Sequence, residues 1–383
     1  MSEPSPLLIV GASARAAAQS AQRAGFAVTA IDLFADEDLA ACASAIRCDD
    51  YPRGLVGLAA RAPDGPWMYT GGLENHPRVV ERISARRPLW GNAPDVLRAV
   101  RNPFEVSATL DREGLPTLEV RRDARDLPGD GTWFAKPIAG SGGGRIRVLD
   151  GHFVNCRKEP RYFQRRKRGK SASAVFVAAR GQAVLLGASE QVIGEPWTGG
   201  KMFQYAGSIG PLEFDGRPLD DRLYDEITEL GRVLAAEFGL TGLFGVDGIL
   251  DGEHFWPVEV NPRYTASCEI VERLSGVNVV AAHAAACRES NLTAPADPHR
   301  QIHAAGKAIV FAPTDATFGE RAAALVERLN AETPRRQAAD TPRIGTRFSP
   351  GDPVLTVLAE TERPADVRKK LMRLANDLRE RLA

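Results

Sequence analysis

Short apolar runs and glycine turns alternate at the start of the chain. Residues 7–10 and 26–31 are apolar runs typical of buried strands, and the alanine-rich residues 14–24 between them favour a helix. Strand, glycine turn, helix and strand in this order predict a βαβ unit of a parallel sheet. Residues 67–71 are expected to add a later strand to that sheet. The turn Gly11-Ala12-Ser13 lacks the GxGxxG spacing of a dinucleotide site, so we interpret it as a tight turn.

A change of pattern near residue 95 predicts a domain boundary. A helix is expected over residues 103–113, because Pro103 favours its start and Gly114 its end. The apolar runs that follow are short and separated by turn residues, which is typical of an antiparallel α+β unit; they are 133–137, 145–149, 162–165, 174–179 and 183–191. The remaining predicted elements are a helix over 220–238, a hairpin of 245–251 and 254–261 turning at Asp251-Gly252, a strand-rich unit over 305–359 and an amphipathic helix over 363–383.

The composition excludes several classes of protein. The 383 residues are 44% hydrophobic, which suits two or three packed units, and the formal net charge of zero lacks the basic excess of a nucleic-acid-binding protein. The cysteines are odd in number without a CxxC pair, and no HExxH is present, so we expect neither a disulfide framework nor a zinc site. The cysteines are Cys42, Cys48, Cys156, Cys268 and Cys287.

The chain shows no targeting or membrane signal. Its N-terminus lacks the charged start and apolar run of a signal peptide. No stretch reaches about 18 uninterrupted apolar residues, so no membrane span is predicted. A cytoplasmic location is the expectation.

The predicted hairpin gathers oxygen-bearing side chains. Glu259 and Asn261 lie two apart on one strand and share a face, and pairing across the turn would bring Asp247 close to Glu259. Two carboxylates and an amide oxygen form a hard ligand set that suits Mg²⁺ held also by phosphates. A polar-faced edge hairpin is the alternative. Arg263 follows directly and would hold a phosphate or carboxylate, or else form a surface salt bridge.

A lysine strand followed by small residues is the second signal. Burying Lys136 inside an apolar strand is expensive unless its ammonium meets an anion. The run 140–144 offers backbone N–H groups that can wrap phosphate oxygens, although it is not a Walker A loop, because no GK[ST] follows. Alone, this run fits an ordinary flexible hairpin about as well. With the acidic hairpin downstream, it favours a nucleotide site.

The lysine strand, the glycine run and the Asp/Glu-x-Asn hairpin together resemble the ATP-grasp superfamily, over roughly residues 95–290. The resemblance implies an α/β plus α+β architecture. A Rossmann-like pre-ATP-grasp domain would cover 1–95. A two-lobed ATP-grasp domain would cover 96–290, with a hinge near 164–170, and a small C-terminal lobe and helix would cover 291–383.

The resemblance also assigns roles to the residues of these motifs. ATP would bind between the two lobes with one or two Mg²⁺ ions, or Mn²⁺ as the alternative metal. Lys136 would contact the α- and β-phosphates and Arg263 would steady an acyl phosphate, so both are expected to be catalytic. Asp247, Glu259 and Asn261 would bind the metal, with Glu259 bridging. The lid over the phosphates would be Ser141, Gly142, Gly143 and Gly144, and the adenine-binding hinge would include Gln164, Arg165 and Arg166.

Two positions depart from the family pattern. The hinge has Arg165 where an acidic residue is usual, and Arg98 or Arg101 would have to replace an early lysine. The basic run 165–170 lacks the stacking aromatics of a nucleic-acid patch; a hinge, a cradle for an anionic substrate and a solvated loop are the alternatives. Residues 344–353 resemble the C-terminal lobe of carboxylase-like members.

The implied reaction joins a small-molecule carboxylate to an amine through an acyl phosphate, with ADP released. Neither nucleic acid nor a membrane is an expected partner, and a homodimer is a family-level expectation. Residues 261–269 resemble ATP-grasp proteins linked to tetrahydromethanopterin or methanofuran one-carbon metabolism. Glutamate or another amino acid, joined to a cofactor precursor, is therefore the expected substrate.

The expected substrate contacts come from two places. Glu74 and Asn75 follow the strand 67–71, and ligands of open α/β sheets bind at the carboxyl ends of strands. Tyr264, Thr265 and Glu269 follow the metal strand. For each of them a loop, capping or packing role is the alternative.

Two other functions fit the same motifs. An ATP-dependent carboxylase that uses bicarbonate is favoured by the resemblance of residues 344–353. A non-catalytic nucleotide-binding regulatory protein is favoured by the missing hinge acid and early lysine.

Overall fold

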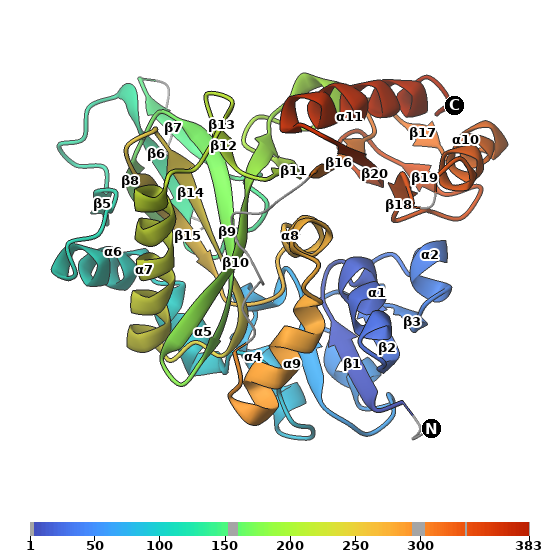
Figure 1. Cartoon of the computed structure of the whole chain (residues 1–383), viewed down its shortest axis with the longest axis horizontal. Coiled ribbons are helices and arrows are strands. Elements are labelled where there is room, and N and C mark those ends of the chain that lie inside the picture. Colours follow the sequence, from blue (N-terminus) through green and yellow to red (C-terminus); the bar gives the residue numbers. More distant parts are fainter. Residues whose placement is uncertain (1–3, 152–159, 293–302, 334, 383) are drawn as a thin grey trace.

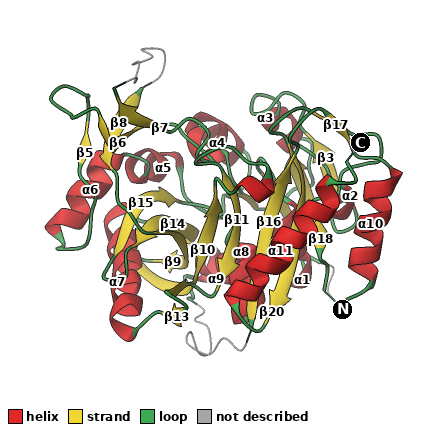
Figure 2. Ribbon diagram, turned by 90° about the horizontal axis from the view of Figure 1, so that it is seen from above, coloured by secondary structure: helices red, strands yellow, loops and turns green. Residues whose placement is uncertain are grey.

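Three main sheets and the helices around them organise the chain (Figures 1 and 2). The computed structural model describes residues 4–151, 160–292, 303–333 and 335–382. The N-terminal residues form a parallel sheet, residues 120–165 form a small antiparallel sheet, and an eight-stranded antiparallel sheet runs through the rest.

The N-terminal sheet has helices on both faces. Its strand order is β3-β2-β1-β4. Alternate residues of β1 point to opposite faces: Leu7 and Ile9 pack with α1, whereas Leu8 and Val10 pack with α3 and α4. This burial on both sides explains the continuous apolar run. The strands are β1 (Pro6–Val10), β2 (Ala27–Asp32), β3 (Ser44–Arg47) and β4 (Trp67–Tyr69), and the helices are α1 (Arg15–Arg23), α2 (Glu37–Ala40), α3 (Leu55–Ala59), the 3₁₀ turn η1 (Leu73–Asn75), α4 (Pro77–Ser84) and α5 (Pro94–Val100).

The small sheet has the order β5-β8-β6-β7 and lies beside α6 (Pro103–Arg112). The helix begins where the sequence predicts, because Asn102 caps it through the N–H of Phe104 and Pro103 follows. Residues 166–169 then connect this sheet to the large one. The strands are β5 (Val120–Arg121), β6 (Asp130–Pro137), β7 (Arg147–Asp150) and β8 (Arg161–Arg165).

The large sheet has the order β15-β14-β9-β10-β11-β16-β20-β18. Along β9, Phe176 and its alternate neighbours pack against α7, whereas Val175 and Val177 pack on the face covered by α8 and α9. Its strands are β9 (Lys170–Ala179), β10 (Gln182–Ile193), β11 (Tyr205–Gly210), β14 (Gly242–Leu250), β15 (Phe255–Asn261), β16 (Ala304–Phe311), β18 (Ala338–Ala339) and β20 (Pro353–Thr361). The covering helices are α7 (Asp221–Phe238), α8 (Cys268–Ser275) and α9 (Val279–Glu289).

The C-terminal lobe extends the large sheet and adds two helices, α10 (Glu320–Ala331) and α11 (Pro364–Arg379). Because β16, β18 and β20 belong to the same sheet as β9–β15, that sheet crosses the limit predicted at residue 291. The domain limits themselves stay predictions. The smaller elements are η2 (Pro196–Thr198) and the ribbons β12 (Glu213–Phe214) with β13 (Arg217–Pro218) and β17 (Ala316–Thr317) with β19 (Arg347–Phe348).

One predicted unit differs from the structure. Residues 305–359 are expected to be strand-rich, yet α10 lies among the strands. Its buried residues Ala322, Leu325, Val326 and Leu329 recur at helical spacing, which is the signal for this helix. The apolar pattern alone also does not predict α8, α9 or β11.

Two observations concern membrane-spanning helices and the state of the cysteines. None of the described helices is long and apolar enough to cross a membrane. The cysteines Cys42, Cys48, Cys268 and Cys287 are free thiols, and Cys156 lies outside the described residues.

Candidate active site

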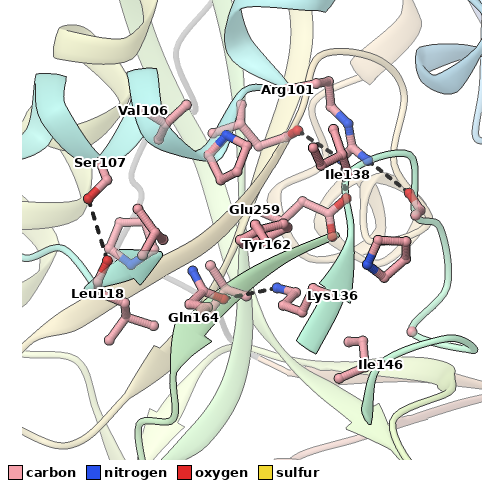
Figure 3. A pocket seen from close by; sticks show the side chains of 18 of the residues that line it. Arg101, Val106, Ser107, Leu118, Lys136, Ile138, Ile146, Tyr162, Gln164 and Glu259 are labelled. Atoms are coloured by element: carbon pink, nitrogen blue, oxygen red, sulfur yellow. Dashed lines mark hydrogen bonds and ion pairs between the residues drawn. The ribbon is translucent and has the colours of Figure 1, made fainter. Parts of the chain in front are cut away.

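A cleft lies between the small sheet, α6 and the β14–β15 hairpin (Figure 3). Lys136 from β6 and Glu259 from β15 both line it, and Arg101 reaches in from the end of α5. The rest of the lining is largely apolar and includes Val100, Val106, Leu110, Leu118, Ile138 and Ile146. A flat apolar group and a charged group of one ligand would therefore find separate surfaces here.

Lys136 is the buried cation of the cleft. Its side chain is almost fully buried, and its Nζ donates a hydrogen bond to Oε1 of Gln164 at 3.0 Å. The Nζ also lies 5.6 Å from the centre of the Tyr162 ring, on the residue that pairs with Lys136 across β6 and β8. No carboxylate pairs with Lys136 among the described residues, so an anionic ligand would complete its contacts.

The glycine run borders the same cleft. Ser141, Gly143 and Gly144 line it, and the carbonyl oxygen of Gly142 accepts from the N–H of Tyr205 at 3.2 Å. Gly143 has φ +74°, and a Cβ at this position would lie 1.8 Å from the carbonyl oxygen of Phe203. Only glycine permits this close approach, which holds the run against the segment before β11.

The hairpin places the two predicted carboxylates opposite each other. Asp247 pairs directly with Glu259 across β14 and β15, and Nδ2 of Asn261 donates to Oδ2 of Asp247 at 2.9 Å. Burial, together with the charge of Glu259, raises the pKa of Asp247 to about 6. The described residues contain no group of three or more His, Cys, Asp or Glu side chains suited to a metal. The predicted ligand set of Asp247, Glu259 and Asn261 therefore includes one amide in place of a third carboxylate.

These three side chains nevertheless fit a hard cation. All three have side-chain oxygen atoms, and a cation would offset both causes of the raised pKa of Asp247, its burial and the nearby charge of Glu259. The side chain of Glu259 is 32% exposed and lines the cleft, so a cation there would also reach a phosphate.

Two arginines connect the hairpin to the N-terminal sheet. Arg101 pairs with Glu259 through Nη1, and its Nη2 donates to Oδ1 of Asn75 at 3.2 Å and to the carbonyl of Gly140 at 2.8 Å. Burial alone would lower the pKa of Arg101, but the carboxylate of Glu259 raises it. Arg101 lines the cleft and Arg98 does not, and the replacement of the family's early lysine by either arginine stays a prediction.

Arg263 forms the second connection. Its Nη2 donates to Oε1 of Glu74 at 2.7 Å and to Oδ1 of Asn261 at 3.1 Å. Burial would raise the pKa of Glu74, but the guanidinium of Arg263 holds it below its ordinary value. Asn75 therefore reaches the cleft lining through Arg101, whereas Glu74 and Arg263 pair with each other outside that lining.

Several predicted residues lie elsewhere. Arg165 and Arg166 do not line the cleft: Arg165 is 58% exposed beside Glu119, and the N–H of Arg166 donates to the carbonyl of Thr132. Their assignment to nucleotide binding stays a prediction, whereas Gln164 does reach the cleft.

The residues after the metal strand point to other partners. Thr265 is buried, in contact with Cys268. Glu269 binds Arg15 through both carboxylate oxygens and Lys307 at 3.1 Å. These contacts favour packing roles over substrate contacts.

Some residues of the cleft lining were not predicted from the sequence to bind a ligand. Tyr162 and the apolar side chains of α6 occupy the cleft wall, although their pattern is that of ordinary core residues. Lys307, which lies outside the cleft, was not singled out from the sequence either. The signal that identified Lys136 applies to it as well, because Lys307 is a buried lysine inside an apolar strand.

Comparisons with known proteins match this architecture. Residues 101–267 match the family described as the ATP-grasp domain. An uncharacterised protein of Methanocaldococcus jannaschii is 23% identical over 380 residues, covering 92% of this chain and 88% of that protein.

Solved structures share the fold over nearly the whole chain. Biotin carboxylase from Campylobacter jejuni has a TM-score of 0.72 at 13% identity and covers 98% of this chain and 91% of its own. L-amino acid ligase from Bacillus licheniformis has a TM-score of 0.67 at 16% identity, with 98% of each chain covered. Carboxyaminoimidazole ribonucleotide synthase from Aspergillus clavatus has a TM-score of 0.70 at 15% identity, with 100% of each covered. Residues 101–267 therefore match the ATP-grasp domain, and the chain as a whole shares the fold of these solved structures.

Proposed function

We propose that the protein is a Mg-ATP-dependent ligase that activates a small-molecule carboxylate as an acyl phosphate and joins it to an amine. The proposal rests above all on one arrangement: Glu259, which pairs with Asp247 across the hairpin, and the buried ammonium of Lys136 line one cleft with an apolar wall. The match of residues 101–267 to the ATP-grasp domain supports an enzyme that uses ATP with Mg²⁺.

Each charged group has a role in this proposal. The adenine would contact the apolar wall, while Lys136 and the N–H groups of the glycine run would bind the phosphates. Glu259, Asp247 and Asn261 would hold Mg²⁺, which would supply charge neutralisation at the phosphates. Arg101 and Arg263 would stabilise negative charge on the transferring phosphoryl group.

The chemistry then needs no protein nucleophile. A carboxylate oxygen of the acid attacks the γ-phosphorus, and ADP leaves. The amine nitrogen next attacks the acyl carbon, phosphate leaves, and the nitrogen loses a proton. Catalysis would come from positioning and electrostatics, because the protein forms no covalent bond.

The sequence resemblance supports a more specific proposal for the two substrates. Glutamate or a similar amino acid would be joined to a cofactor precursor, with Asn75 and Glu74, the partners of Arg101 and Arg263, near the acid. A cytoplasmic location and a homodimer stay predictions, as does the link to one-carbon metabolism.

A bicarbonate-dependent carboxylase is the second candidate. It is favoured by the similarity to biotin carboxylase and to carboxyaminoimidazole ribonucleotide synthase, which extends through the C-terminal lobe. In that case bicarbonate would replace the carboxylic acid and form carboxyphosphate. A regulatory protein that binds nucleotide without turnover is the third.

Release of ADP against a panel of substrates separates these functions. A ligase should release ADP only when an amino acid or polyglutamate is present with an amine. A carboxylase should require bicarbonate instead, and a regulatory protein should bind ATP but release no ADP with any combination. ADP release that needs bicarbonate alone would overturn the ligase proposal.

A further inference from the structure

Two hydroxyl groups lie in the apolar wall of the cleft. Ser107 comes from the middle of α6, and Thr117 lies in the loop before β5. Both residues are partly exposed and line the cleft, and the wall around them includes Val106, Leu110 and Leu118. A few polar groups set in an apolar wall are what fixes the orientation of a ligand in such a site.

The two hydroxyls form a chain in which each hydrogen already has an acceptor. The Oγ1 of Thr117 donates to the Oγ of Ser107 at 3.1 Å. The Oγ of Ser107 donates in turn to the carbonyl oxygen of Leu118 at 3.4 Å (Figure 3). A hydroxyl carries one hydrogen and two acceptor lone pairs. Because both hydrogens are used inside the wall, Ser107 and Thr117 can only accept a hydrogen bond from a ligand.

This hydroxyl chain lies away from the arginine of the cleft. Figure 3 shows Ser107 and Leu118 on one side of the cleft and Arg101 on the other. In the proposed function, the phosphates bind at Lys136 and the glycine run, and the base lies on the apolar wall. The base is then the part of the nucleotide that faces Ser107 and Thr117.

Purine bases differ in what they offer to an acceptor. Adenine carries an amino group at its position 6, and this group donates hydrogen bonds. Guanine and hypoxanthine carry a carbonyl oxygen at the same position, which can only accept. Two acceptors that face each other with no hydrogen between them both stay unsatisfied, and this costs free energy in an apolar setting.

We propose that Ser107 and Thr117 determine the base specificity of the cleft, because they accept the hydrogens of the 6-amino group of adenine and disfavour a base with a carbonyl there. This inference rests on the proposed function, since it needs a nucleotide in the cleft. A site that hydrogen-bonds one group of its ligand discriminates against an analogue that lacks this group. The cleft therefore selects adenine nucleotides over inosine and guanosine nucleotides.

Calorimetric titration of the full chain tests the proposal, with Mg²⁺ and two non-hydrolysable triphosphates, one with adenine and one with hypoxanthine as the base. The wild type should bind the adenine analogue at least about tenfold more tightly. Thr117→Val removes one acceptor, while the hydrogen of Ser107 stays with Leu118. It should weaken adenine binding by about threefold to tenfold and change hypoxanthine binding little.

Ser107→Ala should change the affinities for the two bases in opposite directions. It removes the acceptor of the Thr117 hydroxyl, whose hydrogen then becomes free to donate to a ligand. The variant should bind the hypoxanthine analogue about threefold or more tightly than the wild type does, and the adenine analogue more weakly. A general disturbance of the wall would weaken both. Alanine favours the helical conformation of α6, so this variant should fold.

Two further variants serve as controls. Thr117→Ser keeps a hydroxyl at this position and should retain the preference for adenine. Thr132→Val removes a hydroxyl of the small sheet that bonds Asp130 and does not line the cleft. It should bind both analogues as the wild type does.

The outcomes distinguish this inference from the proposed function. Lys136→Met should weaken binding of both analogues by about tenfold or more, because it removes a charged partner of the phosphates. If adenine binding depends on Lys136 but the wild type binds hypoxanthine equally well, the inference is wrong and the nucleotide site stands. The same holds if Ser107→Ala and Thr117→Val keep the wild-type ratio of the two affinities. If neither analogue binds, or if binding does not depend on Lys136, the inference and the proposed function are both wrong.

Discussion

Replacing Asp247 by asparagine should stabilise the ligand-free protein while abolishing ATP turnover. The carboxylate of Asp247 is held near that of Glu259 in a buried setting, which raises its pKa from 3.8 to about 6. Asparagine has nearly the same shape, and its side-chain oxygen can still accept the hydrogen bond that Asn261 donates. The substitution therefore removes a charge and little else.

The size of the effect follows from the change in pKa. Each tenfold change in acidity corresponds to about 1.4 kcal/mol, so ionised Asp247 destabilises the fold by at most about 3 kcal/mol. Partial exposure of the side chain to solvent lowers this figure, and we expect about 1–2 kcal/mol.

The contribution of Asp247 to the free energy of unfolding changes with pH in the direction opposite to that of a salt-bridged carboxylate. Below the unfolded pKa the group is protonated in both states, and the wild type has no penalty from it. As pH rises from about 4 through about 6, the unfolded chain releases the proton first, so the wild type loses this stability. Asp247→Asn avoids the loss, and its advantage should appear only at the higher pH.

Thermal unfolding at about pH 5 and about pH 8, without metal or nucleotide, measures this difference. Asp247→Asn should unfold at a higher temperature than the wild type at about pH 8, by a few degrees, with a smaller gap at about pH 5. Equal or lower stability of the variant at about pH 8 would refute the reasoning about paired carboxylates. ADP release measured on the same sample should be lost.

Three other substitutions test separate parts of the structure. Lys136→Met should lower the turnover rate by at least about a hundredfold with little change in circular dichroism, because it removes the buried cation of the cleft; near-normal steady-state rates would contradict this. Gly143→Ala should raise KM for ATP by about tenfold or more, because the added Cβ displaces the glycine run from Phe203; an unchanged KM would contradict the close approach. Arg15→Met should lower the free energy of unfolding by about 3–5 kcal/mol, because it leaves the buried Glu269 and the partly buried Asp340 without their shared partner. Denaturant titration that shows no loss of stability would contradict this.

The local motifs of the cleft could be predicted from the sequence because their chemistry is local. Glu259 and Asn261 share a face by the two-residue period of a strand, and the short turn at Asp251 puts Asp247 opposite Glu259. Lys136 could be identified because burying its ammonium in an apolar strand costs free energy unless an anion pairs with it.

Contacts between distant segments could not be predicted in this way. Arg263 pairs with Glu74, 189 positions away, and Arg101 reaches Glu259 across 158 positions. No periodicity within one element contains that information, because it depends on how the sheets pack. The same limit applies to Glu269: its position after the metal strand suggested a substrate contact, whereas its partners Arg15 and Lys307 come from the two ends of the chain.

The central claim is that the β14–β15 hairpin holds the Mg²⁺ of Mg-ATP. Calorimetric titration with a non-hydrolysable ATP analogue, with and without Mg²⁺, tests it most directly. The wild type should bind the nucleotide more tightly when Mg²⁺ is present. Glu259→Gln should lose this dependence on Mg²⁺, while Glu253→Gln, an exposed glutamate in the turn of the same hairpin, should keep it. If Glu259→Gln responds to Mg²⁺ as the wild type does, the hairpin does not hold the metal and the proposed active site is wrong.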